Sequence, residues 1–317
     1  MSDRILLGDI GGTNLRFAWM AGEETSPLTV LPRAEYQGLA DAIADHLEKS
    51  GSSRPDAMAL AVAGPVRDNR VVMTNAGWHL DAAALGHHLG VPRVHLVNDF
   101  AATAWSLSRL SASDLVQIGG SSPPLGGVRV VCGPGTGLGV AAVVPTAEGE
   151  MVIAGEAGHM TLAGQDAQQD AVIARLRNRF GHVSAERALS GPGLENLHAA
   201  LTEAMGRKVA EHTAAEIVIS AREGRCEMCR LAIELFCSLL GGFAGDLALA
   251  FGARGGVYLA GGILPRMLDL LRASDFRMRF EAKGRFHDYL APVPAFAILH
   301  PEPAILGLQA MIAARHI

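Results

Sequence analysis

The sequence predicts an α/β fold, and three observations lead to this prediction. Short apolar segments alternate with segments of helical spacing through both halves of the 317-residue chain. The chain is 49% hydrophobic and 19% charged, which supplies a sizeable core. Two turns rich in glycine and threonine, each between apolar strands, lie far apart in the chain. Together these features indicate two related α/β halves, and the length suits two domains.

The first of these turns follows an apolar strand near the N-terminus. The segment Leu6–Met20 contains an apolar run, a glycine turn, and then Leu15, Phe17 and Trp19 in the alternation of a half-buried strand. Glycine permits positive φ and a close approach of a ligand to the backbone, and successive turn N–H groups form a nest for an anion. Asp9 is placed to orient a hydrated divalent cation there. We predict a phosphate-binding hairpin, with an ordinary hairpin turn as the alternative.

The second turn repeats this design. The segment Val128–Val144 consists of an apolar strand, the turn Gly133-Pro134-Gly135-Thr136-Gly137 and a second apolar strand. Neither turn continues into the Gly-Lys-Ser/Thr of a P-loop, and neither opens a helix as the dinucleotide fingerprint requires. Two such hairpins predict a duplicated unit that holds one polyphosphate from both sides.

Periodicity and apolar runs predict the remaining elements. Helices are expected at 35–49, 82–89, 100–110, 168–180, 184–189, 194–205, after the capping box at 213–216, and at 225–251 and 304–315; strands are expected at 57–63, 71–75, 94–97, 256–260 and 296–299. Residues 119–127 are expected to form a loop near a domain boundary. The long helix contains Gly241, Gly242 and Gly245, which cost ~1 kcal/mol each relative to alanine. We therefore expect them to pack closely against a neighbour.

Polar residues next to predicted strands and loops are the candidates for chemistry. Asn98 and Asp99 stand where an apolar strand becomes a helix, and a carboxylate there can accept a hydroxyl proton during phosphoryl transfer. Helix capping is the alternative for this pair. Glu156 and His159 share a loop of small residues, where the alternative is a lone acid and a solvated histidine. Glu186 lies in the first turn of a predicted helix, where the helix dipole alone can account for it.

Two further motifs allow two interpretations each. Gly261-Gly262 follows an apolar strand, so it could let an adenine ring lie against the backbone or form a tight strand-to-helix turn. Cys226 and Cys229 form a Cys-x-x-Cys pair, but they share one predicted helix with the nearest other thiol, Cys237. We predict buried, inert thiols there rather than a redox or zinc site, and no metal-ligand set elsewhere.

Composition disfavours several classes of function. The net charge of −5 and the lack of a basic block disfavour nucleic acid or an acidic membrane as a partner. Charges at Asp3, Arg4 and Asp9 disfavour a secretory signal. Four cysteines in apolar surroundings suit a reducing compartment. We expect a cytoplasmic protein that binds neither nucleic acid nor a membrane.

The order of the motifs resembles a known family. The motifs are Asp9-Ile-Gly-Gly-Thr13, Asn98-Asp99-Phe100, Gly135-Thr-Gly-Leu-Gly139, Gly155-Glu-x-Gly-His159, Ser184-Ala-Glu-Arg187, Ser190-Gly-Pro-Gly193 and Gly261-Gly-Ile-x-Pro265. Over essentially the whole chain they are similar to the bacterial ATP-dependent glucokinases of the actin and hexokinase superfamily. Family members often have alanine in place of Pro134. The related repressor and kinase group with a zinc motif is disfavoured because residues 160–169 contain no cysteine.

The resemblance implies a two-domain actin/hexokinase-like (ribonuclease H-like) fold with the active site in the interdomain cleft. It implies a small domain at 1–109, completed by 300–317, and a large domain at 110–299. Asp99 would be the base that takes the proton from the sugar 6-hydroxyl. ATP, Mg²⁺ and glucose are the implied cofactors and substrate, and a homodimer is the implied assembly. The implied sugar-binding residues are Asn98, Asp99, Glu156, His159 and Glu186; the implied nucleotide-binding residues are Gly8, Asp9, Ile10, Gly11, Gly12, Thr13, Gly135, Thr136, Gly137, Gly261 and Gly262.

Three other functions stay open on the sequence alone. The substrate could be another hexose, such as mannose, fructose or glucosamine. A sugar-sensing regulator without catalysis is a second alternative, although no DNA-binding segment precedes Ile5. An actin-like or chaperone ATPase is a third, which the set of Glu156, His159 and Glu186 disfavours.

Overall fold

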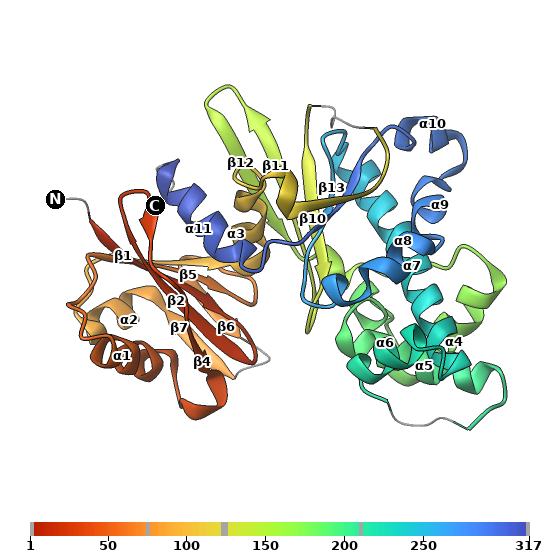
Figure 1. Cartoon of the computed structure of the whole chain (residues 1–317), viewed down its shortest axis with the longest axis horizontal. Coiled ribbons are helices and arrows are strands. Elements are labelled where there is room, and N and C mark those ends of the chain that lie inside the picture. The colour runs from red at the N-terminus through yellow and green to blue at the C-terminus, as the bar shows by residue number, and fades with distance from the viewer. Residues whose placement is uncertain (1–2, 74–76, 122–125, 209–211, 315–317) are drawn as a thin grey trace. The chain divides into compact units, whose positions relative to one another are not determined.

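The chain divides into two units. The structure, a computed structural model, describes residues 3–73, 77–121, 126–208 and 212–314. Unit 1 consists of residues 1–110 together with 300–317, and unit 2 consists of residues 111–299. The C-terminal helix therefore lies among the first elements of the chain, as its blue colour among red and orange elements shows (Figure 1).

Unit 1 contains a mixed sheet whose strand order is β3-β2-β1-β5-β8, with β4 paired to β2. β1 and β2 form the antiparallel hairpin around the first glycine turn, and β1, β5 and β8 are parallel. A separate hairpin joins β6 to β7. The strands are β1 (Arg4–Ile10), β2 (Asn14–Ala21), β3 (Glu24–Thr25), β4 (Thr29–Pro32), β5 (Ala57–Val62), β6 (Arg70–Met73), β7 (Trp78–Asp81) and β8 (Val94–Asn98).

Four α-helices of unit 1 pack against this sheet. The helices are α1 (Leu39–Lys49), α2 (Ala82–Leu89), α3 (Asp99–Ser106) and α11 (Pro303–Ala313), with a 3-10 turn, η1, at Arg33–Glu35. Leu6 and Ile10 of β1 join a buried cluster with residues of α1 and α2. α11 packs against α3 so closely that a Cβ at Gly307 would lie 1.6 Å from the carbonyl oxygen of Ala102.

The sheet of unit 2 repeats the arrangement of unit 1. Its order is β12-β11-β10-β13-β14-β9, in which β10 pairs antiparallel with β11 and parallel with β13, and β13 pairs parallel with β14. The strands are β9 (Leu115–Gly119), β10 (Arg129–Pro134), β11 (Leu138–Thr146), β12 (Gly149–Gly155), β13 (Gly256–Leu259) and β14 (Ala295–Ile298). Each glycine turn thus joins two antiparallel strands at the corresponding place of its sheet.

The helices of unit 2 gather around the long helix α7 (Figure 1). They are α4 (Ala167–Phe180), α5 (Gly191–Ala204), α6 (Ala214–Arg222), α7 (Glu227–Phe251), α8 (Leu268–Ala273), α9 (Phe276–Glu281) and α10 (His287–Leu290); 3-10 turns lie at Ala112–Asp114 (η2), Ala157–His159 (η3), Ala185–Arg187 (η4), Leu264–Met267 (η5) and Gly284–Phe286 (η6). α7 is long and apolar enough to cross a membrane, but 83% of its most apolar window is buried inside the protein. Its composition is that of a core helix.

Two of the three glycines of α7 have the close backbone packing that the sequence predicted. A Cβ at Gly241 would lie 2.1 Å from the carbonyl oxygen of Phe276, and one at Gly245 would lie 2.4 Å from that of Phe280. Both oxygens belong to α9. A Cβ at Gly242 would meet only the side chain of Gln165, at 3.0 Å. The helix cost of two of the three glycines is therefore offset by a close approach of the α9 backbone.

Several predicted elements need correction. The helix expected at 35–49 begins at Leu39, because Gly38 has an extended backbone and is the N-cap residue. The helix expected at 184–189 is only the 3-10 turn η4. α5 begins at Gly191 and not at Leu194, because the Ser190 side chain caps it by accepting from the N–H of Gly193.

Other differences concern strands and undescribed residues. β3, β4, β7, β9 and β12 were not predicted as strands, and β9 includes Gly119 from the expected loop. Parts of the expected strand 71–75, loop 119–127 and helix 304–315 lie outside the described residues, at 74–75, 122–125 and 315. The capping box that opens α6 is present, with the hydroxyl of Thr213 and the carboxylate of Glu216 as predicted.

Candidate active site

The first glycine turn lies at the carboxyl end of β1. The N–H of Gly11 donates to the carbonyl oxygen of Asn14 at 3.1 Å, which closes the turn. A Cβ at Gly12 would meet no atom within 4 Å, so this position is open to a ligand. Gly8 differs, because a Cβ there would lie 2.7 Å from Leu60 inside the core. None of these three glycines has a positive φ, so the turn provides close access to the backbone rather than a left-handed conformation.

Asp9 belongs to a group of three charged side chains. Its carboxylate accepts a hydrogen bond from Arg16 Nη1 at 3.0 Å, and Arg16 Nε lies 3.2 Å from a carboxylate oxygen of Glu302. Burial raises the pKa of Asp9, and Arg16 opposes this shift. Burial also raises the pKa of Glu302, which Arg16 lowers and Asp9 raises further. The sequence analysis missed Arg16 and Glu302; the β1–β2 register, which sets Arg16 opposite Asp9, was the available signal for the first.

A second arginine also touches the turn. Arg33 Nε donates to the carbonyl oxygen of Gly12 at 2.6 Å, and the N–H of Arg33 donates to that of Thr13 at 2.9 Å. The Arg33 guanidinium lies over the ring of Trp78, 5.6 Å from its centre. It therefore brings positive charge to the turn where we predicted a phosphate. The sequence had no signal for this residue, because β4 was not predicted.

Asn98 and Asp99 lie where β8 becomes α3, as predicted. The Asn98 side-chain oxygen accepts from the N–H groups of Phe100 and Ala101, each at 3.0 Å, and its Nδ2 donates to the carbonyl oxygen of Gly64 at 3.1 Å. Asn98 is thus the N-cap residue of α3. Asp99 is the first residue of the helix and is half-buried, and its Oδ1 accepts from the N–H of Phe100 at 2.9 Å.

Strand register places the turn and the aspartate at the same edge of the sheet. Ile10 of β1 is paired with Val62 of β5, and Val62 is paired with Asn98 of β8. Neighbouring parallel strands are ~4.8 Å apart. The first glycine turn follows the end of β1 and Asp99 follows the end of β8, with β5 between these two strands. Both therefore lie at the carboxyl ends of the parallel strands, where α/β proteins bind their ligands.

In unit 2, the second glycine turn is packed against the end of β13. A Cβ at Gly133 would lie 2.1 Å from the carbonyl oxygen of Ala260. Gly261 has a φ of +103°, and a Cβ there would lie 2.3 Å from the carbonyl oxygen of Pro134. Glycine is required at both positions by this backbone contact. Gly262 has open space around its Cα, as Gly135 has, so these two positions are accessible to a ligand.

Glu186 contacts the second turn directly. Its Oε2 accepts from the N–H of Leu138 at 2.9 Å and would lie 2.5 Å from a Cβ at Gly137. The N–H of Gly191, which begins α5, donates to the carbonyl oxygen of Gly135 at 2.8 Å. The structure thus brings together Gly135, Gly137 and Glu186, which were predicted separately.

Glu156 and His159 lie at η3, beside the same turn. A Cβ at Gly158 between them would be 2.0 Å from the carbonyl oxygen of Leu138, so η3 packs on the start of β11. A bridge between Thr161 and Ser184 joins this segment to η4. The side chains of Glu156 and His159 are exposed. These backbone contacts place η3, η4 and the second glycine turn next to one another in unit 2.

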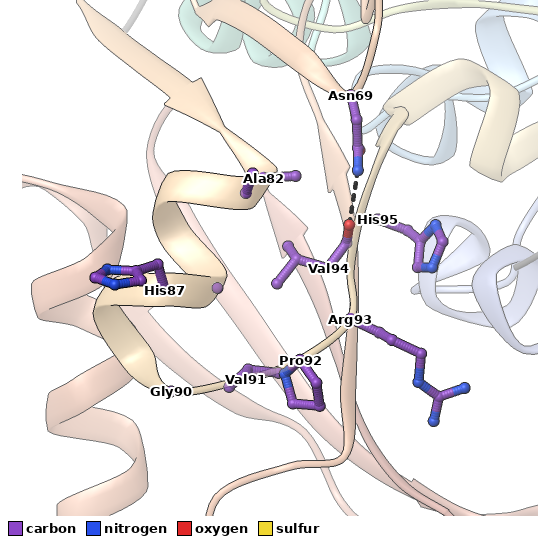
Figure 2. Close-up of a pocket in the computed structure, with 11 residues that line it drawn as sticks. Asn69, Ala82, His87, Gly90, Val91, Pro92, Arg93, Val94 and His95 are labelled. Carbon is purple, nitrogen blue, oxygen red and sulfur yellow. Dashed lines mark hydrogen bonds between the residues drawn. The ribbon is translucent and has the colours of Figure 1, made fainter.

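A pocket of about 720 Å³ in unit 1 does not include any predicted site residue. It lies at the amino end of β8, next to Arg93 and His95, with His87 on α2 across from them (Figure 2). Asn69 donates to the carbonyl oxygen of Val94 and accepts from the N–H of Leu96, both at 2.7 Å. The polar groups of Asn69 therefore hold the backbone of β8, and we assign this pocket no part in the site.

Comparisons with known proteins identify the family. The family model described as Glucokinase matches residues 6–315. The glucokinase of Paramagnetospirillum magneticum is 44% identical over 316 residues, which cover 98% of each chain. The chain belongs to the glucokinase family. The resemblance inferred from the order of the motifs is thereby confirmed.

Solved structures give the same result for the fold. The glucokinase from an Antarctic psychrotroph is 35% identical and covers 99% of each chain with a TM-score of 0.85. The glucokinase of Balamuthia mandrillaris, solved in complex with glucose, is 22% identical, has a TM-score of 0.78, and covers 99% of this chain and 94% of its own. The chain has the fold of this family, and the predicted actin/hexokinase-like α/β class is confirmed.

Proposed function

We propose that the protein is a glucokinase that transfers the γ-phosphoryl group of ATP to the 6-hydroxyl of D-glucose, giving glucose 6-phosphate and ADP. The observation that carries this proposal is the 44% identity to a glucokinase over 98% of the chain. The arrangement at the carboxyl ends of the parallel strands supports it, because each glycine turn, and Asp99 in unit 1, lies where such a fold binds ligands. The interdomain active site implied by the resemblance stays a prediction.

Asp99 is the proposed general base. It would accept the proton of the sugar 6-hydroxyl as that oxygen attacks the γ-phosphorus, while the bond to the ADP oxygen breaks. Its position supports this role, since it is half-buried at the start of a helix whose cap is provided by Asn98. Phosphoryl transfer depends mainly on positioning and on stabilising the developing charge. One well-placed carboxylate is therefore enough to accept the proton of the attacking hydroxyl.

The two glycine turns are the proposed phosphate contacts. Gly12 and Gly135 have open space, which lets phosphate oxygens approach the backbone N–H groups. Arg33 at the first turn would add positive charge. Asp9 has carboxylate oxygens, the type of ligand that Mg²⁺ prefers, and would orient the hydrated ion. When bound, this ion would neutralise phosphate charge.

The proposed sugar contacts are Asn98, Asp99, Glu156, His159 and Glu186. Carboxylates, an amide and an imidazole suit a neutral polyol, because each provides directional hydrogen bonds to hydroxyl groups. A phosphorylated or acidic substrate would instead require arginine side chains. We further propose that the enzyme acts in glycolysis in the cytoplasm, without a membrane or nucleic-acid partner, and forms a homodimer, which light scattering after size exclusion would measure.

The first test measures ADP release from Mg·ATP without sugar and with glucose, mannose, fructose or glucosamine. We expect glucose to stimulate turnover most. Greater stimulation by another hexose would keep the mechanism and change the substrate. If no sugar raised the rate above that with ATP alone, the regulator or ATPase interpretation would replace the proposal.

The second test replaces Asp99 by asparagine. We expect kcat to fall by about 10²–10⁴-fold, the usual contribution of a general base, while glucose binding measured by calorimetry persists. Asp41→Asn is a matched control, because Asp41 is an exposed aspartate in the first turn of α1. Near-normal turnover in the Asp99→Asn variant would exclude this residue as the base.

A further inference from the structure

Four metal-binding side chains from three parts of unit 2 lie together. They are His198 on α5, His212 just before α6, Cys226 at the N-cap of α7 and Cys229 in its first turn. One potential ligand atom from each lies within 4.8 Å of those of the other three. The two imidazole rings meet edge to face, with their centres 5.2 Å apart. Such a group needs a physical explanation that the proposed kinase chemistry does not supply.

We propose that His198, His212, Cys226 and Cys229 bind one structural Zn²⁺ ion. Two thiolates and two imidazoles are a ligand set that tetrahedral zinc sites use, and the Cys-x-x-Cys spacing is typical of them. Four protein ligands leave no open position for a substrate, so the site is structural and not catalytic.

The start of α7 prepares the two cysteines for a cation. Cys226 precedes the helix, and its Sγ accepts from the N–H of Cys229 at 3.3 Å. This contact turns the Cys226 sulfur toward the first turn of α7. Partial positive charge at a helix N-terminus favours thiolates over thiols. The local structure therefore lowers the cost of the charged form that zinc requires.

Burial and charge balance also fit zinc. His198 is 3% exposed and Cys229 is fully buried, while His212 and Cys226 are half-buried. Binding displaces one proton from each thiol, so Zn²⁺ and two thiolates form a neutral group with two neutral imidazoles. The cluster therefore offers a largely buried and charge-balanced set of ligands for zinc.

The ion would add a further connection between three segments of unit 2. It would join α5, the residue before the α6 capping box, and the first turn of α7. The other end of α5 begins at Gly191, which donates to the carbonyl oxygen of Gly135. The site would thus stabilise the helix that supports the second glycine turn. The sequence predicted inert thiols because the two histidines become neighbours of the cysteines only in the folded chain.

The test measures bound zinc in the full-length, untagged protein. The purified chain is incubated with Zn²⁺ under reducing conditions, dialysed and analysed by mass spectrometry for metals. We expect about one zinc per chain, as a closed site requires. We also expect the cobalt-substituted protein to show thiolate-to-cobalt charge-transfer absorption and the d–d bands of a tetrahedral site. Neither readout depends on kinase activity, so the result is independent of the proposed function.

Variants separate the proposed ligands from other thiols and histidines. Cys226→Ser and His212→Ala should lose the bound metal and the cobalt spectrum while circular dichroism shows a folded chain. Cys237→Ser, on the same helix but outside the cluster, and His87→Ala should retain both. A chelator should lower the unfolding midpoint of the wild type and leave that of Cys226→Ser unchanged.

Three outcomes would overturn the proposal. The first is wild-type protein that keeps no zinc after dialysis and gives no cobalt spectrum. The second is metal retained equally by the Cys226→Ser and His212→Ala variants, which would place it elsewhere. The third is a Cys226–Cys229 disulfide, found by mass spectrometry in protein prepared without a reductant, that persists when Zn²⁺ is supplied.

Discussion

At the scale of single residues, the absence of a side chain at Gly137 leaves room for the carboxylate of Glu186. Its Oε2 occupies the space that a side chain at position 137 would fill, 2.5 Å from the site of a Cβ. The same oxygen accepts from the N–H of Leu138. The contact with Glu186 therefore explains the glycine at 137, and substitution there tests the position of the carboxylate.

We expect Gly137→Ala to displace the Glu186 carboxylate and leave the fold largely intact, because the clash involves the end of a flexible side chain. The KM for glucose should rise about tenfold, in the range of one lost hydrogen bond to a charged group. Steady-state kinetics and thermal unfolding measure the two effects, and Glu186→Gln is the matched comparison. An unchanged KM in both variants would limit Glu186 to bracing the turn.

A second prediction concerns the pH dependence of stability near Arg16. The pKa of Glu302 is raised from 4.5, so the folded state binds more protons than the unfolded state just above that pH. The free energy of unfolding therefore decreases as pH rises through the interval between the ordinary and the raised pKa. Glu302→Gln removes this titration. We expect the variant to unfold at a higher temperature than the wild type at neutral pH.

The difference should shrink on acidification, where Glu302 becomes protonated in both states. Thermal unfolding from about pH 4 to about pH 8 covers the interval. Glu48→Gln, at an exposed position of α1, measures the effect of an amide outside this group of charges. A lower unfolding temperature for Glu302→Gln at neutral pH would mean that its ion pair with Arg16 outweighs the cost of burial.

The residues missed by the sequence analysis have a common physical reason. Asn98 and Asp99 were found because they directly follow an apolar run, which is a local signal. Arg33 reaches the first glycine turn, and Glu302 reaches Arg16, from other segments of the chain. Their positions depend on tertiary packing, which spacing along the chain does not encode. The same holds for His198 and His212 beside the two cysteines.

At the scale of elements, segments with strong local signals were predicted best. The helix at 82–89 matches α2, and the strand at 57–63 matches β5 to within a residue. Both have clear ends, since the Asp81 side chain caps α2 and Gly64 follows β5 with a positive φ. Edge strands such as β4 and β9 are short and only partly buried. Their weaker apolar pattern explains why they were not predicted.

The α7 glycines provide a matched test at this scale. Gly241→Ala places a Cβ 2.1 Å from a backbone oxygen of α9, so the two helices must separate. We expect a loss of about 1–3 kcal/mol in the free energy of unfolding, as for other overpacked sites. Gly242→Ala gains ~1 kcal/mol of helix propensity and meets only the Gln165 side chain. It should be near neutral or stabilising in urea unfolding. Equal effects would contradict the packing explanation.

At the scale of the whole molecule, the two units share one sheet design. In each, the glycine turn joins the first parallel strand to an antiparallel hairpin partner, β1 to β2 in unit 1 and β10 to β11 in unit 2. The repeated turns predicted this duplication from the sequence. The return of the C-terminal helix to unit 1 followed only from the family resemblance, because nothing in the composition of 304–314 indicates its partner.

Truncation tests this discontinuity. α11 contacts α3, β1 and β5, and its Ile305, Leu308 and Met311 are buried. Each buried side chain of this kind contributes about 1.5–3 kcal/mol, so their loss is comparable with the ~5–15 kcal/mol stability of a domain. A chain ending at Leu299 should lose hydrogen-exchange protection in β1, β5 and α3 but keep it in α7. A chain ending at Ala314 retains α11 and should remain protected throughout. Protection of β1 and β5 in the shorter chain would show that unit 1 folds without its C-terminal helix.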